Sequence, residues 1–170
     1  MVGIFKQLRD WWNKDKELYE QVERDFNQAY DDWENELMLL PAEEARRRAA
    51  ALLANPDRFR CEEDPLTDQD GRKLASLAPL LREFLERYRR VEAVEDTQYL
   101  SRELERAHGP FLTLGYDQDL DQLLIKPGDE AIYTWGEASE GPEPDRLCDS
   151  VYHCLLYLDR MNGINRAPQT

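Results

Sequence analysis

The chain has 170 residues, a length that suits one domain, or one domain with a helical extension, and that can bury a core without disulfides or metals. Its 36 acidic and 22 basic side chains give a net charge of −14 and a pI near 4.6. Nucleic acid and anionic membranes bind through an excess of Lys and Arg, so this charge argues against both. It favours a basic protein partner, unless it serves only to keep the protein soluble.

Apolar residues recur at helical spacing through the first forty residues. The stripe consists of Ile4, Leu8, Trp11, Leu18, Val22, Phe26, Ala29, Trp33, Leu37 and Leu40. This spacing predicts a helix, which would span roughly 54 Å if unbroken. Because that exceeds an ordinary domain core, we expect the helix either to break or to project. Trp12, Tyr19 and Tyr30 widen the stripe, which suits packing against several neighbours.

A second helix is predicted over residues 42–54, where AEEARRRAAALLA is rich in alanine. Pro41 fits its first turn, because the N–H that proline lacks is unused there. Glu43 and Glu44 lie near the positive end of the helix dipole, and Asn55-Pro56 ends the helix.

The next stretch, residues 55–72, holds two prolines, a glycine and many polar groups. It predicts a loop and a domain boundary. We therefore predict a helical extension over residues 1–55 and an α+β domain over residues 73–163, with one continuous domain as the alternative.

The middle of the chain predicts two helices and a strand. The apolar face of the first helix, from about Lys73 to Arg90, consists of Leu77, Leu80, Leu81, Phe84, Leu85 and Tyr88. The β-branched stretch Val91–Val94 predicts a short strand. The sequence TQYLSRELERAHG then predicts a short helix, with Thr97 as its N-cap, Gly109 as its stop and His108 bonded to its last carbonyls.

The pattern changes after Gly109. The runs PFLTLGYD, QLLIKPGD and AIYTWGE predict three short strands in an antiparallel meander. Residues 137–146 predict an acidic loop, and residues 147–161 an amphipathic closing helix that Asn162-Gly163 terminates. Helices, a small sheet of three to five strands and a closing helix together indicate an α+β fold.

The three cysteines, Cys61, Cys148 and Cys154, form no disulfide or metal-binding pattern, which favours a reducing cytoplasm. Helical residues six apart point in different directions, so we expect Cys148 and Cys154 on different faces and no metal bound by them with His153. We expect buried, inert thiols. The first residues do not resemble a signal peptide, and no stretch is long and apolar enough to span a bilayer.

Asp117, Asp119 and Asp121 alternate like the start of a calcium loop. Such a loop requires Gly and Glu where this chain has Gln122 and Gly128, so we expect a solvated hairpin and no metal. The sequence contains no GxGxxG, P-loop, GxSxG or HExxH motif, and its carboxylates are too many for one catalytic pair to be chosen. We predict a protein that is not an enzyme and holds no cofactor.

Acidic residues gather in the predicted strand connections after Gly109, where 11 acidic and 4 basic residues occur. The predicted partner-binding residues are Asp117, Asp119, Asp121, Asp129, Glu130, Trp135, Glu137, Glu140 and Glu143. A tryptophan beside carboxylates is typical of the anchor and rim of a protein interface. Alternatively, Tyr133 and Trp135 belong to the core as the more apolar side of their strand, and the acids are solvated turns.

Several phrases over residues 74–160 resemble the SUKH superfamily of Smi/Knr-like immunity proteins. They are LASLAPLLREFLERY, PFLTLGYDQDLDQLLIKPGDEAIYTWG and CDSVYHCLLYL. The usual Asn-Gly-Gly turn is replaced by Arg89, Arg90 and Val91, and the long first helix lies outside the usual core. The resemblance implies a bacterial antitoxin that binds a cognate toxin and blocks its active site. Many such toxins are nucleases and therefore basic.

The leading hypothesis is thus a cytoplasmic, non-catalytic immunity protein whose carboxylates pair with Lys and Arg of a basic toxin. The alternative is a helical adaptor or scaffold, in which Ile4, Leu8, Trp11 and Leu18 dock into a partner's groove or build a homodimer. A third idea, that IFKQLRDWW lies on a membrane surface, is disfavoured by the overall charge. The sequence leaves the oligomeric state open.

Overall fold

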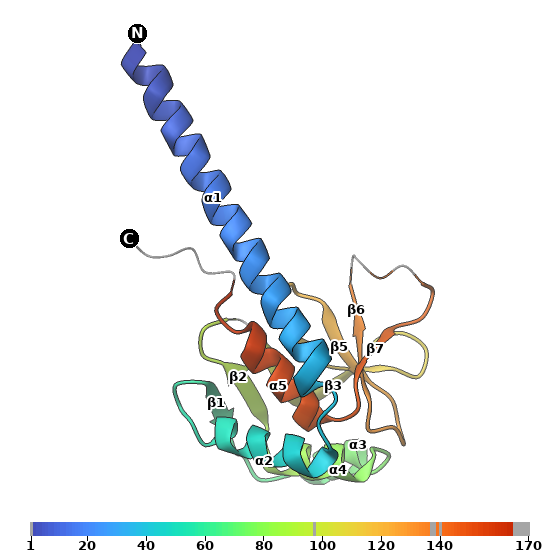
Figure 1. Ribbon diagram of the computed structural model, residues 1–170. Helices are drawn as coiled ribbons and strands as arrows, with labels where there is room; N and C mark the ends of the chain where they lie inside the picture. The colour runs from blue at the N-terminus through green and yellow to red at the C-terminus, as the bar shows by residue number, and fades with distance from the viewer. Residues whose placement is uncertain (1, 97, 137–138, 140, 165–170) are drawn as a thin grey trace.

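The computed structural model describes residues 2–96, 98–136, 139 and 141–164, with the backbone alone for residues 2–5. In this part of the chain the fold is α+β, as predicted, and Figure 1 shows its arrangement. The helices are α1 (Val2–Asp32), the π-helical η1 (Trp33–Leu37), α2 (Ala42–Leu53), α3 (Asp68–Leu74), α4 (Pro79–Arg87) and α5 (Val151–Met161). The strands are β1 (Phe59–Glu62), β2 (Arg90–Ala93), β3 (Tyr99–Arg106), β4 (Leu112–Tyr116), β5 (Gln122–Ile125), β6 (Ile132–Trp135) and β7 (Asp145–Cys148).

The strands form a single antiparallel meander in the order β1-β2-β3-β4-β5-β6-β7. The predicted strands β2, β4, β5 and β6 are confirmed, but the sheet has seven strands rather than three to five. The three additional strands, β1, β3 and β7, lie in stretches for which the local sequence predicts loop or helix.

Strand β3 corrects the prediction of a helix over TQYLSRELERAHG. Its residue Leu100 is buried between Val91 of β2 and Gly115 of β4, so pairing on both sides overrides the helical preference of the local sequence. Gly109, with φ of 54°, turns the chain between two strands and ends no helix, and His108 caps none. Thr97, the predicted N-cap, lies outside the described residues.

The predicted loop over residues 55–72 contains β1 and α3. Phe59 is buried and lies opposite Ala93, so β1 closes one edge of the sheet. Helix α3 begins at a capping box, in which Thr67 Oγ1 accepts from the Asp70 N–H and the Asp70 carboxylate accepts from the Thr67 N–H. Such short elements are hard to recognise locally because the tertiary contacts supply most of their stability.

The remaining helices differ from the predictions mainly at their ends. The helix expected over residues 73–90 is α4, which starts with Pro79 in its first turn. Pro41 is the N-cap residue of α2 rather than part of its first turn. Strand β7 takes the end of the predicted acidic loop and the start of the predicted closing helix, so α5 begins only at Val151.

One face of the sheet is covered by helices, with α2 and α5 in front of the strands in Figure 1. Helix α5 is central, because nine of its eleven residues are buried, and Leu155 and Leu158 are almost fully enclosed. Leu81 and Leu85 of α4 belong to the same hydrophobic cluster. This cluster is the core of the molecule.

Helix α1 projects from the body and touches it only near its C-terminal end (Figure 1). There Trp33 of η1 is buried edge-on against Tyr157, with ring centroids 5.3 Å apart, and Asp32 forms an ion pair with Arg160. The predicted long helix is thus confirmed, and of the two possibilities, projection rather than a break accounts for most of its length.

Candidate protein-binding surface

The second face of the sheet carries a line of half-buried side chains that we call the aromatic row: Tyr99, Tyr116, Gln122 and Trp135. Successive members lie opposite one another on β3, β4, β5 and β6, so the row crosses the sheet at right angles to its strands. Strand alternation turns these side chains away from the core, because their neighbours Leu100 and Leu123 face the helices.

Ring and charge contacts hold the two ends of the row. The Tyr99 and Tyr116 ring centroids lie 5.7 Å apart, and the Arg90 guanidinium lies 3.9 Å above the Tyr99 ring. At the other end, Trp135 stacks on His108 with an angle of 17° between the rings. These contacts restrain the aromatic side chains before any partner arrives, which lowers the entropy that binding costs.

The expectation that Tyr133 and Trp135 fill the core is wrong. Ile132 is fully buried and lies opposite Cys148 on the core side, while Tyr133 and Trp135 are half-buried on the second face. Tyr133 packs against Phe111 of the β3–β4 connection, which covers this part of the second face. The helices already supply large apolar side chains to the core, so the strand can turn its aromatic side outward.

Close approach of the backbone opens a small hollow beside the row. A Cβ atom on Gly115 would lie 1.8 Å from the Tyr99 carbonyl oxygen, so only glycine fits where β3 and β4 meet. The hollow measures about 130 Å³ and is lined by the row residues Tyr99 and Tyr116 together with Arg90 and Glu103.

Acidic residues concentrate at one end of the sheet. In a meander, the β2–β3, β4–β5 and β6–β7 connections lie at the same end, and here they span residues 94–98, 117–121 and 136–144. Together these connections contain eight acidic residues and no Lys or Arg. We call them the acidic hairpins. Tyr116 and Gln122 of the aromatic row directly flank the second one.

Two of the predicted partner-binding carboxylates serve the fold instead. Asp117 is only 4% exposed, and one of its carboxylate oxygens accepts hydrogen bonds from the N–H groups of Asp119 and Asp121 at 2.9 and 3.0 Å. Burial raises the pKa of Asp117 to about 6 against these two hydrogen bonds. Glu130 accepts from the N–H groups of Leu80 and Leu81, so it caps α4 from 50 residues away. The expectation that the 117–121 connection is simply solvated is wrong at Asp117.

The other predicted residues divide between packed and exposed positions. Asp121 packs against Gly136, and Asp129 accepts hydrogen bonds from the Ala131 N–H and the Tyr133 hydroxyl. Asp119 and Glu143 are exposed. Glu137 and Glu140 lie outside the described residues. Asp119 lines a hollow with Tyr19 and Phe26 of α1, while Asp117 and Glu130 serve the fold.

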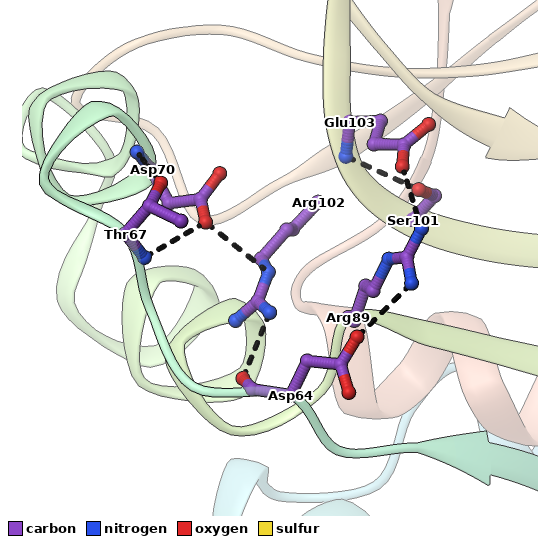
Figure 2. A network of polar contacts seen from close by, with 7 residues as sticks. All are labelled: Asp64, Thr67, Asp70, Arg89, Ser101, Arg102 and Glu103. Atoms are coloured by element: carbon purple, nitrogen blue, oxygen red, sulfur yellow. Dashed lines mark hydrogen bonds and ion pairs between the residues drawn. The ribbon is translucent and has the colours of Figure 1, made fainter.

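A polar network that the sequence did not suggest ties the loop before α3 to the sheet (Figure 2). Arg102 of β3 is 4% exposed, donates to the Asp64 carbonyl oxygen at 2.8 Å and lies 4.0 Å from the Asp70 carboxylate. Asp70 is also the capping-box partner of Thr67. This buried arginine holds α3 and the loop before it against the sheet. No sequence motif predicts the contact.

The same network reaches the second face through Arg89, which bridges Asp64 at 3.0 Å and Glu103 at 3.3 Å (Figure 2). Ser101, next to the hollow, accepts from the Glu103 N–H at 3.1 Å. Both arginines and three carboxylates line a cavity of about 360 Å³, so their charges largely cancel there. The network fixes the edge of the surface rather than adding a charged site to it.

The cysteines also depart from expectation. Cys148 lies on β7 rather than on α5, and the turn between the two elements brings its side chain against Cys154. Hydrogen bonding to Cys148 and burial raise the pKa of Cys154 well above its usual value. Burial also raises the pKa of Cys61, which lines a cavity of about 290 Å³ with Arg87 and Tyr152. The thiols of Cys61 and Cys154 are therefore poorly disposed to act as nucleophiles.

His153 is engaged on both ring nitrogens. Its Nε2 lies 2.9 Å from the Leu40 carbonyl oxygen and therefore donates to it, and its Nδ1 lies 2.8 Å from Ser150 Oγ. Within the described ranges, no three His, Cys, Asp or Glu side chains converge as metal ligands, and no helix has the length and apolar character needed to cross a bilayer.

Comparison of the chain with protein-family models, with curated proteins and with solved structures finds no match in any of the three. The resemblance to the SUKH superfamily therefore stays a prediction.

Proposed function

We propose that the chain is an immunity protein that binds a basic cognate toxin, such as a nuclease, and occludes its active site. The observation that carries this proposal is the aromatic row, which crosses the sheet face that the helices leave free and runs past the acidic hairpins. The resemblance of residues 74–160 to the SUKH superfamily supports the same function.

Two parts of the surface have different tasks in this proposal. The rings of Tyr99, Tyr116 and Trp135 are the anchors, because large aromatic side chains contribute most of the energy at protein interfaces. The exposed carboxylates of Asp119 and Glu143 pair with Lys and Arg beside the toxin's substrate groove. Charges at the rim mainly raise the association rate, and high salt weakens that effect.

The test is affinity capture of the tagged chain from its host's lysate at low and high salt, followed by an activity assay of the captured protein. We expect a basic protein at equal stoichiometry, whose activity the purified chain abolishes at a 1:1 ratio. The variant Tyr99→Ala/Tyr116→Ala should bind it roughly 100-fold more weakly, since two anchors are removed.

The matched control is Trp12→Ala/Tyr30→Ala, which removes two exposed aromatic side chains from α1. It should capture the same protein with unchanged affinity. Circular dichroism of both variants should match that of the wild type, which would show that they are folded. An immunity function is contradicted if the row variant binds as well as the wild type, or if the captured protein keeps its activity when bound.

A helical adaptor is the second candidate, and the exposed stripe on α1 favours it. Leu8, Trp11 and Tyr19 are 57, 61 and 72% exposed. In the same capture experiment, an adaptor would lose its partner with Leu8→Glu/Trp11→Glu and keep it with the row variant. The opposite pattern supports the immunity function.

A further inference from the structure

The N-terminal part of α1 continues an interface that the chain itself only begins. At 100° per residue, Leu8, Trp11 and Val22 lie on the same side of α1 as Ala29, which is buried against the body. Leu18 and Val22 are half-buried, and beyond them Leu8 and Trp11 stand free. The apolar stripe is thus one surface, of which only the C-terminal third is covered.

The charges of α1 are divided along its length. Residues 2–16 carry four basic and two acidic side chains, a net charge of +2. Residues 17–32 carry six acidic and one basic side chain, a net charge of −5. A parallel pair of such helices would place like charges together, whereas an antiparallel pair places the basic half of each helix along the acidic half of the other.

We infer that the occupant of the stripe is a second copy of the chain, paired through α1 in antiparallel orientation. Asp15 is the polar residue in the middle of the stripe, and Lys14 and Lys16 flank it. Centring the pair there places the two aspartates among four lysine ammonium groups. A polar residue within an apolar seam fixes register in helical pairs.

This register matches apolar with apolar and basic with acidic residues. Leu8 of one copy lies beside Val22 of the other, and Trp11 beside Tyr19. The charged residues nearest the seam are Lys14 and Lys16 in the basic half of α1, and Glu23 and Asp25 in its acidic half. The overlapping segments, about 22 residues each, are roughly 33 Å long, which exceeds the length of an average helix in a globular protein.

The root of α1 has room for the tip of the partner's helix. A cavity of about 480 Å³ lies there between α1 and the end of α5, lined by Leu18, Val22 and Ala29 on one side and by Arg160 and Ile164 on the other. The two bodies then lie at opposite ends of the pair. The aromatic row is on the other face of the sheet, so the pairing leaves the row uncovered.

The first measurement is sedimentation equilibrium of the full chain over about 1–200 µM. We expect a dimer of about 40 kDa in equilibrium with the 20.0 kDa chain. The variant Leu8→Glu/Trp11→Glu should be monomeric throughout, because four carboxylates would enter the apolar seam. The matched control, Asn13→Glu/Gln27→Glu, adds the same charge to the opposite side of α1 and should dimerise like the wild type.

A charge exchange tests the orientation. Lys14→Glu/Lys16→Glu and Glu23→Lys/Asp25→Lys should each dimerise at least roughly tenfold more weakly than the wild type, and an equimolar mixture should recover wild-type affinity, since the charges beside the seam of the mixed pair are again of opposite sign. An unrecovered mixture, or charge variants that dimerise normally, overturns the antiparallel pairing.

Two further outcomes also overturn the inference. One is a wild-type chain that stays monomeric at every concentration. The other is a monomeric chain that binds vesicles of phosphatidylcholine and phosphatidylglycerol, with binding lost in Leu8→Glu/Trp11→Glu, which would assign the stripe to a lipid surface.

Discussion

Helices α1 and α5 show how differently one chain can use two apolar helices. Nine of the eleven residues of α5 are buried, whereas Ala29 is the one buried residue among the described side chains of α1. Helix α5 meets α2, α4, η1 and β7, while α1 packs on α5 near its C-terminal end and has Asp119 of the β4–β5 connection beside it. An apolar stripe is therefore enough to form a helix, but whether the stripe is buried depends on which other elements pack against it.

The sequences of the two helices already carry part of this difference. Helix α5 reads VYHCLLYLDRM and is apolar around most of its circumference, which is typical of an enclosed helix. Helix α1 has an apolar stripe on one side and charges on the other. One neighbouring element is enough to cover a one-sided stripe. Among the described residues, most of α1 has no such neighbour.

The largest expected effect on stability is the difference between two Leu→Ala substitutions, one in each helix. Leu155→Ala in α5 removes a fully buried side chain and should lower the free energy of unfolding by about 2–5 kcal/mol. Leu8→Ala in α1, where the side chain is exposed, should change it by less than about 0.5 kcal/mol in dilute, monomeric protein. Urea denaturation measures both. Equal losses would contradict the description of α1 as a helix outside the cooperative core.

A smaller effect is expected at the joint between the two regions. His153→Phe leaves the buried Leu40 carbonyl oxygen without its donor and should cost about 1–3 kcal/mol. His108→Phe is the matched control, because it keeps a ring on Trp135 at an exposed position and should stay within about 0.5 kcal/mol of the wild type. If the two variants unfold at the same urea concentration, the His153 contact does not fasten the segment between η1 and α2 to α5.

The smallest expected effect, and the one with a pH signature, concerns the carboxylate next to α5. Burial raises the pKa of Asp117 to about 6, so the folded state holds a proton that the unfolded chain releases near its usual pKa of 3.8. Stability is therefore lost as the pH rises through about 4 to 6. Asp117→Asn keeps the oxygen that accepts both N–H groups and should raise the free energy of unfolding at pH 7 by about 1–2 kcal/mol.

The difference between the variant and the wild type should shrink as the pH falls and vanish at about pH 3, where Asp117 is largely protonated in both states. Asp119→Asn, on the exposed part of the same connection, should alter stability at neither pH. Urea denaturation at pH 3 and pH 7 checks the sign. A destabilised Asp117→Asn variant at pH 7 would show that the charged carboxylate contributes to folding.

The candidate surface was only partly visible in the sequence. The acidic residues of the β4–β5 and β6–β7 connections were identified because they are close in sequence, and Trp135 was among the predicted binding residues. The row itself was not predicted, since Tyr99 was assigned to a helix. The burial of Asp117 and the capping role of Glu130 depend on groups that fold against them, one of them 50 residues away. Composition locates charge along the chain, and contacts decide which charges remain available.

Elements with a local signal were predictable before the fold was known: the long first helix, α2, the strands β4 to β6 and most of α5. Periodicity and turn residues within about ten positions are sufficient for these. Three other features follow from tertiary contacts: residues 99–106 form a strand, the aromatic side of β6 faces outward, and α1 projects from the body. Each of these features depends on residues distant in sequence. Strand pairing and burial are stabilised by such long-range contacts, which a local sequence pattern does not reveal.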